Sequence, residues 1–345
     1  MRAVVWTGYG KIEVLDVPKP APRANEVLVR VSAACFCKTD IGMIDRGILG
    51  IVPPVIVGHE VSGTVEAVGS SVPGRVRRAL QGLAPGQLVA LEPPVPCRRC
   101  DICREGLTHM CPNTLHIGAH TPGGMAEYIC IDYRNAHPVP DGLPAAAAAL
   151  AEPFAVCLHA WARAGGVAGK TAVVIGDGPF GIIAARMARR SGAAQVLLFG
   201  HHASRMALAE PYGVQAFDSR RVDAGEQILQ ATGGYGAHAL VDTSGAAPVL
   251  ERVPHWLRPR GVMVAFTPPA APVPMDLEMI HFKEIVIAGA CRSLNLFPEA
   301  LRAMHEDAAR TEALVTHRLS IEDAARGFEL ITRNKEQAVK AAIVF

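Results

Sequence analysis

The sequence predicts an α/β protein in which a barrel-like, all-β unit is followed by a doubly wound parallel-sheet unit. Three observations support this fold class. The chain has 345 residues, more than the roughly 250 to 300 at which a single core stops growing, so two domains are expected. Residues 1–140 carry short strand-like runs separated by Gly and Pro. After Pro153 strands alternate with alanine-rich helices, which is typical of a parallel sheet.

In the first unit, residues 1–16 resemble a strand and a hairpin, and further strands are expected at 26–31 and 61–68. The alanines at 145–149 are expected to start a helix. In the second unit we expect strands at 171–175, 195–199, 239–242, 261–266 and 285–290, and a helix at 181–190. The last fifty residues predict helices at 298–306 and 321–332 and a strand at 338–344 that returns to the first unit.

Composition excludes several classes of function. The net charge is +2, from 34 basic and 32 acidic residues, so no broad field attracts nucleic acid or an anionic membrane. The N-terminus lacks the apolar segment of a signal peptide. The most apolar stretch, 143–162, is broken by proline and polar residues, which argues against a membrane span. Nine cysteines fit a reducing compartment. We therefore expect a cytoplasmic protein with a small-molecule partner, and no nucleic-acid or membrane partner.

Four cysteines lie close together in the sequence, at Cys97, Cys100, Cys103 and Cys111. Thiolates two residues apart on tight turns can converge on one tetrahedral cation, and a fourth thiolate can close the shell. The alternatives are disulfides or buried thiols that pack as small apolar groups. The spacing favours a structural zinc ion in a lobe at 97–111, which holds metal but performs no chemistry.

A glycine-rich turn follows the strand expected at 171–175. Gly176 permits a tight turn, Gly178 lets a pyrophosphate approach the backbone, and Gly181 allows close helix packing, with Pro179 and Phe180 between them. The helix that follows directs its N-terminus at the phosphates. A strand before and a helix after the motif together predict a dinucleotide site.

The end of the next strand decides which dinucleotide is expected. A carboxylate normally binds the ribose hydroxyls of NAD there, but this strand ends Gly200-His201-His202. The lack of a carboxylate favours NADP over NAD, with His201, His202 and Arg205 as donors to a 2′-phosphate. The alternative is that both histidines are exposed turn residues. Thr243 and Thr267 follow later strands, where ligands bind in open α/β sheets, or simply end those strands.

Three further polar positions stand in apolar surroundings: Cys37, His59 with Glu60, and Glu152. Taken singly, they have ordinary explanations as a buried thiol, a core histidine and a helix-capping carboxylate. Asp40, close to Cys37, either orients a metal ligand or caps a loop.

The motifs follow one another in the same order as in a known family. Cys37-x-Thr39-Asp40, Gly58-His59-Glu60, the four-cysteine lobe, Ala151-Glu152-Pro153 and the glycine-rich turn follow one another along nearly the whole chain. The chain thus resembles the zinc-containing medium-chain alcohol dehydrogenases, particularly the branch of the sorbitol (polyol) and threonine dehydrogenases. That branch is indicated by Glu152, where the alcohol dehydrogenase branch has a second cysteine.

The resemblance implies a GroES-like catalytic domain at 1–153, a Rossmann coenzyme domain at 154–290 and a return to the catalytic domain at 291–345. It implies two zinc ions per chain, with Cys37, His59 and Glu152 as catalytic ligands. Glu60 would be either a ligand or a partner of the metal-bound water. Thr39 would begin the path by which the proton leaves, but Gly42 stands where many relatives have a histidine. Relatives form homodimers and homotetramers through the coenzyme domain.

The expected reaction is hydride transfer between a secondary alcohol, of polyol, sugar or amino-alcohol type, and NAD(P), giving a ketone. A catalytic zinc with an open position favours loss of the alcohol proton. One alternative is an NADPH-linked aldehyde or primary-alcohol dehydrogenase. The other is a noncatalytic relative that keeps only the structural zinc.

Overall fold

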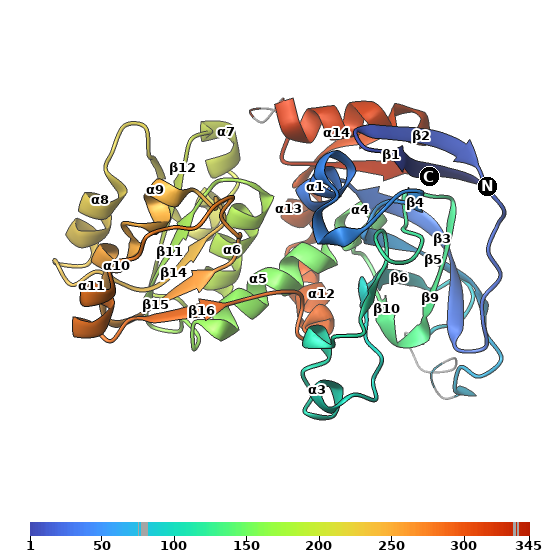
Figure 1. Cartoon of the computed structure of the whole chain (residues 1–345), viewed down its shortest axis with the longest axis horizontal. Helices are drawn as coiled ribbons and strands as arrows, with labels where there is room; N and C mark the ends of the chain where they lie inside the picture. Colours follow the sequence, from blue (N-terminus) through green and yellow to red (C-terminus); the bar gives the residue numbers. More distant parts are fainter. Residues whose placement is uncertain (75, 77–81, 334–335, 337) are drawn as a thin grey trace. The chain divides into compact units, whose positions relative to one another are not determined.

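The computed structural model describes residues 1–74, 76, 82–333, 336 and 338–345. The chain forms two compact units: unit 1 comprises Met1–Glu152 and Phe297–Phe345, and unit 2 comprises Pro153–Leu296 (Figure 1). The sequence places the boundaries after residues 153 and 290, whereas the structure assigns residues 291–296 to unit 2. One contact that ties this segment to unit 2 is a hydrogen bond of 3.0 Å from the His159 imidazole on α5 (Ala151–Arg163) to the Arg292 carbonyl.

Unit 1 contains a mainly antiparallel sheet in the order β10-β6-β5-β3-β18-β17, with β9 also paired to β3. Alternate residues of its strands, such as Val29, Val31 and Val65, form one buried core, as expected for strands with one face inward. A smaller sheet has the order β2-β1-β4. The strands are β1 (Arg2–Gly8), β2 (Lys11–Asp16), β3 (Glu26–Cys35), β4 (Val55–Ile56), β5 (Glu60–Val68), β6 (Leu88–Leu91), β9 (Tyr128–Asp132), β10 (Ala136–Pro138), β17 (Val315–Leu319) and β18 (Lys340–Val344).

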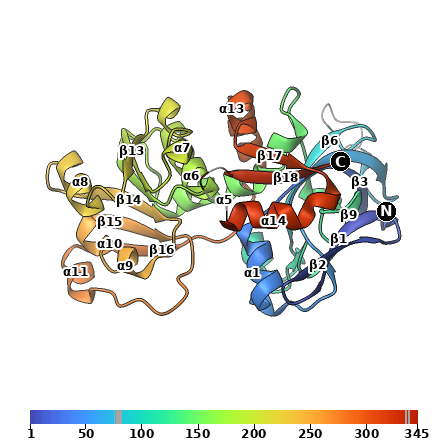
Figure 2. The ribbon, with the colours of Figure 1, turned by 90° about the horizontal axis from the view of Figure 1, so that it is seen from above.

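The C-terminal segment of the chain completes unit 1. β18 pairs with β3, so the return of the chain to the first unit is confirmed. Figure 2 shows α14 lying along β18, and a Cβ atom on Gly327 of α14 would lie 2.2 Å from the ring of Phe36. The helices and 3-10 turns of unit 1 are α1 (Lys38–Arg46), η1 (Ile48–Gly50), α3 (Asp101–Arg104), η2 (Thr108–Met110), η3 (Tyr133–Asn135), α4 (Ala145–Ala148), α12 (Phe297–His305), α13 (Ala308–Glu312), η5 (Ile321–Asp323) and α14 (Ala324–Arg333).

Unit 2 is built on a parallel sheet in the order β13-β12-β11-β14-β15-β16. Numbered from its first strand, this is the 3-2-1-4-5-6 order of a doubly wound dinucleotide-binding sheet. Val173, Leu197 and Leu240 pack with helices α8 and α10 in one buried core. The elements are β11 (Thr171–Ile175), α6 (Pro179–Arg190), β12 (Gln195–Gly200), α7 (Ala203–Met206), η4 (Glu210–Tyr212), β13 (Gln215–Asp218), α8 (Ala224–Ala231), β14 (Ala237–Asp242), α9 (Ala247–Leu250), α10 (Val253–Trp256), β15 (Leu257–Ala265), α11 (Leu277–Phe282) and β16 (Val286–Gly289).

The order of the strands fixes where a ligand can bind in unit 2. β11 lies between β12 and β14. The chain first adds β12 and β13 on one side of β11, and then returns to add β14, β15 and β16 on the other side. Ligands of open α/β sheets bind at the carboxyl ends of the strands beside such a switch point. The glycine-rich turn at residues 176–181 lies at this position. Among the described residues, none of the helices is both long and apolar enough to cross a bilayer.

Candidate functional site

The polar positions Cys37, His59 and Glu60, separated in the sequence, meet inside unit 1. Cys35 of β3 pairs with Glu60 of β5, so the residue just before β5 and the start of α1 lie side by side. One ligand atom from each of Cys37, His59 and Glu60 lies within 4.8 Å of the others, and all three residues are buried. Thiolate, imidazole and carboxylate are the donors that zinc takes in proteins. The residues present therefore fit a mixed-donor metal site.

Asp40 supports two of these residues at once. Its Oδ1 lies 2.9 Å from Nδ1 of His59, and its Oδ2 accepts a hydrogen bond of 3.2 Å from the Cys37 amide. The carboxylate is 1% exposed. Asp40 therefore caps α1 and holds the histidine ring, and its role in orienting a metal ligand stays a prediction. A carboxylate on one ring nitrogen leaves the other for a metal and fixes the ring orientation.

Glu60 has a partner that the sequence analysis missed. The Lys340 ammonium, from β18, donates to both oxygens of the Glu60 carboxylate, and both side chains are almost wholly inaccessible. Lys340 also donates to the Phe36 carbonyl (3.4 Å). Burial lowers the pKa of Lys340, but the charge and hydrogen bond of Glu60, together with the charges of Cys37 and Cys35, outweigh burial and raise that pKa. Lys340 therefore remains a cation beside the metal site.

Glu152 does not belong to the cluster of ligand atoms formed by Cys37, His59 and Glu60. It lies in the first turn of α5. Burial raises the pKa of its carboxyl to about 7, with His59 acting against the shift and Glu60 adding to it. The charges of His59 and Glu60 therefore both act on the Glu152 carboxyl. Its role as a zinc ligand stays a prediction.

Two further positions bear on how a proton could leave this site. Oγ1 of Thr39 lies 3.6 Å from Sγ of Cys37, so the hydroxyl is beside the cluster. A Cβ atom on Gly42 would lie 2.7 Å from Cδ1 of Ile48. Ile48 therefore occupies the space that a side chain at position 42 would need. The ring of His116 lies 5.5 Å from that of His59, centroid to centroid, which the sequence analysis did not anticipate.

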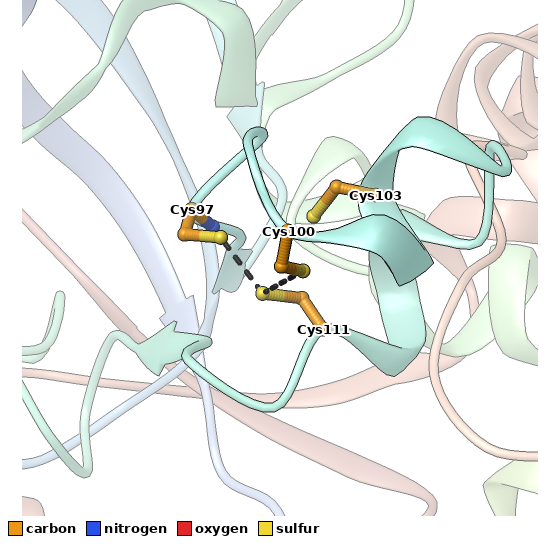
Figure 3. Close-up of side chains that lie close together, drawn as sticks. All are labelled: Cys97, Cys100, Cys103 and Cys111. Carbon is orange, nitrogen blue, oxygen red and sulfur yellow. Dashed lines mark hydrogen bonds between the residues drawn. The ribbon is translucent and has the colours of Figure 1, made fainter.

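The four cysteines of the lobe converge as predicted (Figure 3). The lobe leaves the sheet between the paired strands β7 (Pro94–Val95) and β8 (Leu115–His116). All four sulfur atoms lie within 4.8 Å of one another, and those of Cys100 and Cys111 are 3.8 Å apart. Sulfurs around a tetrahedral zinc with Zn–S bonds of ~2.3 Å are about 3.8 Å apart. All nine cysteines lie in the described part of the chain and are free thiols, so the disulfide alternative is wrong.

The electrostatics of the lobe differ from one thiol to another. Main-chain amides of Arg99 and Cys100 lower the pKa of Cys97 to about 6. Burial raises the pKa of Cys103 to about 12. Amide donors that stabilise a thiolate favour metal binding, because the thiolate is the form that ligates. The lobe fits a closed, all-sulfur structural site.

In unit 2 the glycine-rich turn has the shape that a pyrophosphate requires. Gly176 has φ of 103°, which favours glycine. A Cβ atom on Gly181 would lie 1.8 Å from the Gly176 carbonyl oxygen, whereas one on Gly178 would meet nothing within 4 Å. The first helical residue of α6 is Pro179, and the rings of Phe180 and Phe266 lie 5.3 Å apart. The turn and the helix N-terminus leave an open cradle, so these residues fit a dinucleotide phosphate.

The strand ends around this turn differ from expectation in one respect. Gly200 ends β12 and His201 and His202 follow it, but Asp177 of the turn places its carboxylate against them. The sequence analysis assigned no role to Asp177, and so missed this carboxylate. Arg205 of α7 is buried. Burial lowers its pKa, and the charge of Asp177 acts against that shift.

The two threonines lie where the sequence placed them, at the ends of β14 and β15. Thr243 donates its hydroxyl to the Ile175 carbonyl (2.8 Å), and its Oγ1 would lie 3.2 Å from a Cβ atom on Gly181. Thr267 donates its amide to the Asp242 carbonyl (3.3 Å). Thr243 therefore helps to hold the glycine-rich turn in place, and its hydroxyl is already engaged.

Comparison with known proteins identifies the family to which the chain belongs. Residues 23–141 match the family model "Alcohol dehydrogenase GroES-like domain", and residues 179–306 match "Zinc-binding dehydrogenase". Sorbitol dehydrogenase of Bacillus subtilis is 30% identical, over 99% of this chain and 97% of its own length. The chain belongs to the zinc-containing medium-chain alcohol dehydrogenase family. The predicted family and the predicted GroES-like and Rossmann fold class are confirmed, and the protein is an oxidoreductase.

Other dehydrogenases are also similar to this chain. L-threonine 3-dehydrogenase of Edwardsiella ictaluri is 30% identical over 93% of both chains. The structure of galactitol-1-phosphate dehydrogenase from Escherichia coli superposes with a TM-score of 0.90, at 27% identity over 100% of both chains. A zinc-binding dehydrogenase from Sinorhizobium meliloti, solved with NADP, has a TM-score of 0.91 at 27% identity over 100% of this chain and 99% of its own. The first two of these relatives are named for different substrates.

Proposed function

We propose that this dehydrogenase oxidises a secondary alcohol of polyol, sugar or amino-alcohol type to a ketone, reversibly and with NAD(P) as hydride acceptor. The observation that carries the proposal is the buried cluster of Cys37, His59 and Glu60, supported by Asp40. A noncatalytic relative would have no use for this second set of metal donors. Relatives named for sorbitol, threonine and galactitol 1-phosphate support the substrate class.

The proposal includes two zinc ions per chain. Cys97, Cys100, Cys103 and Cys111 would hold the structural ion. Cys37, His59 and either Glu60 or Glu152 would hold the catalytic one, which supplies a Lewis acid that favours the alkoxide form of an alcohol. The chain's own residues then position and deprotonate the substrate.

Each neighbouring side chain has a role in this reaction. Asp40 keeps the His59 ring oriented, because its carboxylate is on Nδ1. The Thr39 hydroxyl, beside the Cys37 sulfur, accepts the proton of the substrate alcohol and passes it toward water. No histidine follows at position 42, so water takes the next step of the relay. Lys340 holds the Glu60 carboxylate in place.

A cytoplasmic location is part of the proposal. Nine free thiols persist in a reducing compartment. The substrate is a small molecule, in keeping with the buried, polar donor cluster and the balanced surface charge of the chain.

The experiment is a turnover assay on purified, zinc-loaded protein, in which formation of NADH or NADPH is followed with a panel of polyols, sugar alcohols, hydroxy amino acids, secondary alcohols and primary alcohols. Zinc is counted in the same sample. We expect turnover with a secondary alcohol, about two zinc ions per chain, and loss of one zinc and of turnover in Cys37→Ser. Protein with about two zinc ions that turns over none of these substrates with either cofactor would refute the proposal. Turnover of primary alcohols alone would favour the aldehyde-reducing alternative.

A further inference from the structure

β12 ends in a glycine, and the side chain of another residue fills the space beside it. Gly200 is the last residue of β12, the position from which a carboxylate reaches the adenosine ribose in NAD-binding sheets. A Cβ atom on Gly200 would lie 2.4 Å from Cβ and 2.7 Å from Oδ2 of Asp177. The side chain of Asp177 therefore occupies the space in which the usual strand-end side chain would start.

The carboxylate of Asp177 is bonded to the main chain at this strand end. Its Oδ2 accepts hydrogen bonds from the amides of His201 (2.6 Å) and His202 (2.5 Å). Nδ1 of His202 lies 2.9 Å from the same oxygen. Successive amides that point to one place form an anion-binding concavity, and here Asp177 already fills it. A 2′-phosphate could accept hydrogen bonds from these two amides only by displacing the Asp177 carboxylate.

Asp177 carries a charge at neutral pH. Burial alone would raise the pKa of its carboxyl, but the hydrogen bonds from the two histidine amides, with the hydrogen bond and charge of the His202 ring, outweigh burial and lower that pKa. His201, His202 and Arg205 are the basic side chains near this strand end. Nδ1 of His202 faces Asp177, and Arg205 is buried. The cations on which the NADP prediction depended are thus opposed by a nearby negative charge.

We propose that Asp177 sets cofactor choice in this enzyme, selecting NAD over NADP by supplying from the glycine-rich turn the carboxylate missing at Gly200. This inference rests on the proposed dinucleotide-dependent function. Oδ1 would accept the hydrogen bond of a ribose hydroxyl, and the charge of the carboxylate repels a 2′-phosphate. This inference reverses the preference for NADP that was predicted from the sequence. Structures of this fold have been solved with NADP and with NADH, so the fold alone does not decide this choice.

Equilibrium binding of NADH and NADPH, measured separately by titration calorimetry at fixed ionic strength, tests the inference without any substrate. The wild type is expected to bind NADH at least ~10-fold more tightly than NADPH, a difference of about 1.4 kcal/mol. In Asp177→Asn, which keeps an acceptor oxygen but loses the charge, the preference should shrink by about that factor, through tighter NADPH binding and weaker NADH binding. Equal affinities in the wild type, or a preference unchanged in Asp177→Asn, would overturn it.

Further variants distinguish an effect of Asp177 on cofactor choice from an effect on folding. Asp177→Gly combined with Gly200→Asp returns the carboxylate to the strand end and should restore the NADH preference that Asp177→Gly alone loses. A merely structural role for Asp177 predicts no such rescue. Glu226→Gln removes one charge from an exposed position of α8 and should leave the preference unchanged. If neither dinucleotide binds folded wild-type protein, the proposed function fails with the inference. If both bind equally, only the inference fails.

Discussion

At the scale of single residues, Asp40 is the side chain that supports two members of the proposed metal cluster. It contacts Nδ1 of His59 and the Cys37 amide. Removal of such a supporting carboxylate typically lowers metal affinity 10- to 100-fold. We expect Asp40→Ala to lose about that much zinc affinity at the catalytic site and none at the four-cysteine lobe. Competition with a chelator, followed by metal counting, measures both sites in one sample.

The matched control is Asp45→Ala, which removes an exposed carboxylate from the same helix α1. This variant should retain both metals. If Asp40→Ala released zinc no faster than this control, the orienting role of Asp40 would be wrong.

Lys340 and Glu60 form a buried pair whose members depend on each other. Both are almost wholly inaccessible, and a buried charge left without its partner costs about 3–5 kcal/mol. We expect Lys340→Met to lower the free energy of unfolding by about that amount. The double variant Glu60→Gln with Lys340→Met removes both charges and should recover much of the loss. Urea denaturation of the zinc-loaded proteins completes this double-mutant cycle, and additive losses would show that the pair is not coupled.

The Asp177 carboxyl also makes stability depend on pH. Its pKa is lowered on folding, so it contributes stability above its unfolded pKa of ~3.9. That contribution is lost as pH falls through the lower folded value. We expect Asp177→Asn to be about 1–2 kcal/mol less stable than the wild type at pH 7, the scale of hydrogen bonds to a charged group. The difference should shrink as pH falls below ~4. Urea denaturation at several pH values checks this, and a difference independent of pH would contradict it.

The sequence revealed the site residues that lie within motifs and missed those that tertiary contacts bring in. Cys37, Thr39 and His59 stood out because the motifs that contain them follow one another in the order of the family. Lys340 reaches Glu60 from 280 positions away in the chain, and no local spacing reports such a pair. Asp177 was visible in the motif, but its direction depends on Gly200 being a glycine on the next strand. Only the parallel pairing of β11 with β12 reveals that relation.

At the scale of elements, the turn from β11 into α6 has two glycines with different functions. A Cβ atom on Gly181 would lie 1.8 Å from a main-chain oxygen, whereas one on Gly178 would meet nothing. We expect Gly181→Ala to destabilise unit 2 by about 3 kcal/mol, the upper end of the usual cost of overpacking. Gly178→Ala should fold normally and bind NAD(P)H more weakly, because the methyl group enters the phosphate cradle.

Thermal unfolding and dinucleotide titration of both variants distinguish the two effects. Equal loss of stability in the two would show that the turn has no such division of function.

Element prediction succeeded for strands that appear as apolar runs and missed two edge strands with few apolar residues. The strand predicted at 171–175 matches β11 (Thr171–Ile175), because a strand buried on both faces appears as a continuous apolar run. The edge strand β13 (Gln215–Asp218) was missed, since its residues are partly exposed and polar. β17 was also missed. Its sequence, Val-Thr-His-Arg-Leu, has few apolar residues, and its pairing with β18 is a property of the fold.

At the scale of the whole molecule, the edge of the unit 2 sheet bears on assembly. β16 ends the strand order among the described residues, and Val286 and Ile287 are 51% and 45% exposed there. Leu277 and Phe282, from the adjacent helix α11, are 73% and 75% exposed. An apolar edge strand with open main-chain donors and acceptors is a template for pairing. When the same strand of a second copy pairs with it across a two-fold axis, the main-chain donors and acceptors of both strands are satisfied.

We therefore propose that β16 pairs with its copy in a homodimer through the coenzyme domain, as the family resemblance implies. Ile287→Lys places a charge on that edge and should convert the dimer to a folded monomer, measured by light scattering coupled to size-exclusion chromatography. Val52→Lys, which changes an apolar residue 68% exposed in unit 1, should remain dimeric. A wild type that is monomeric at micromolar concentration would contradict the proposal. So would a dimer unaffected by Ile287→Lys, because a lysine ammonium cannot be buried without a partner at an interface of this kind.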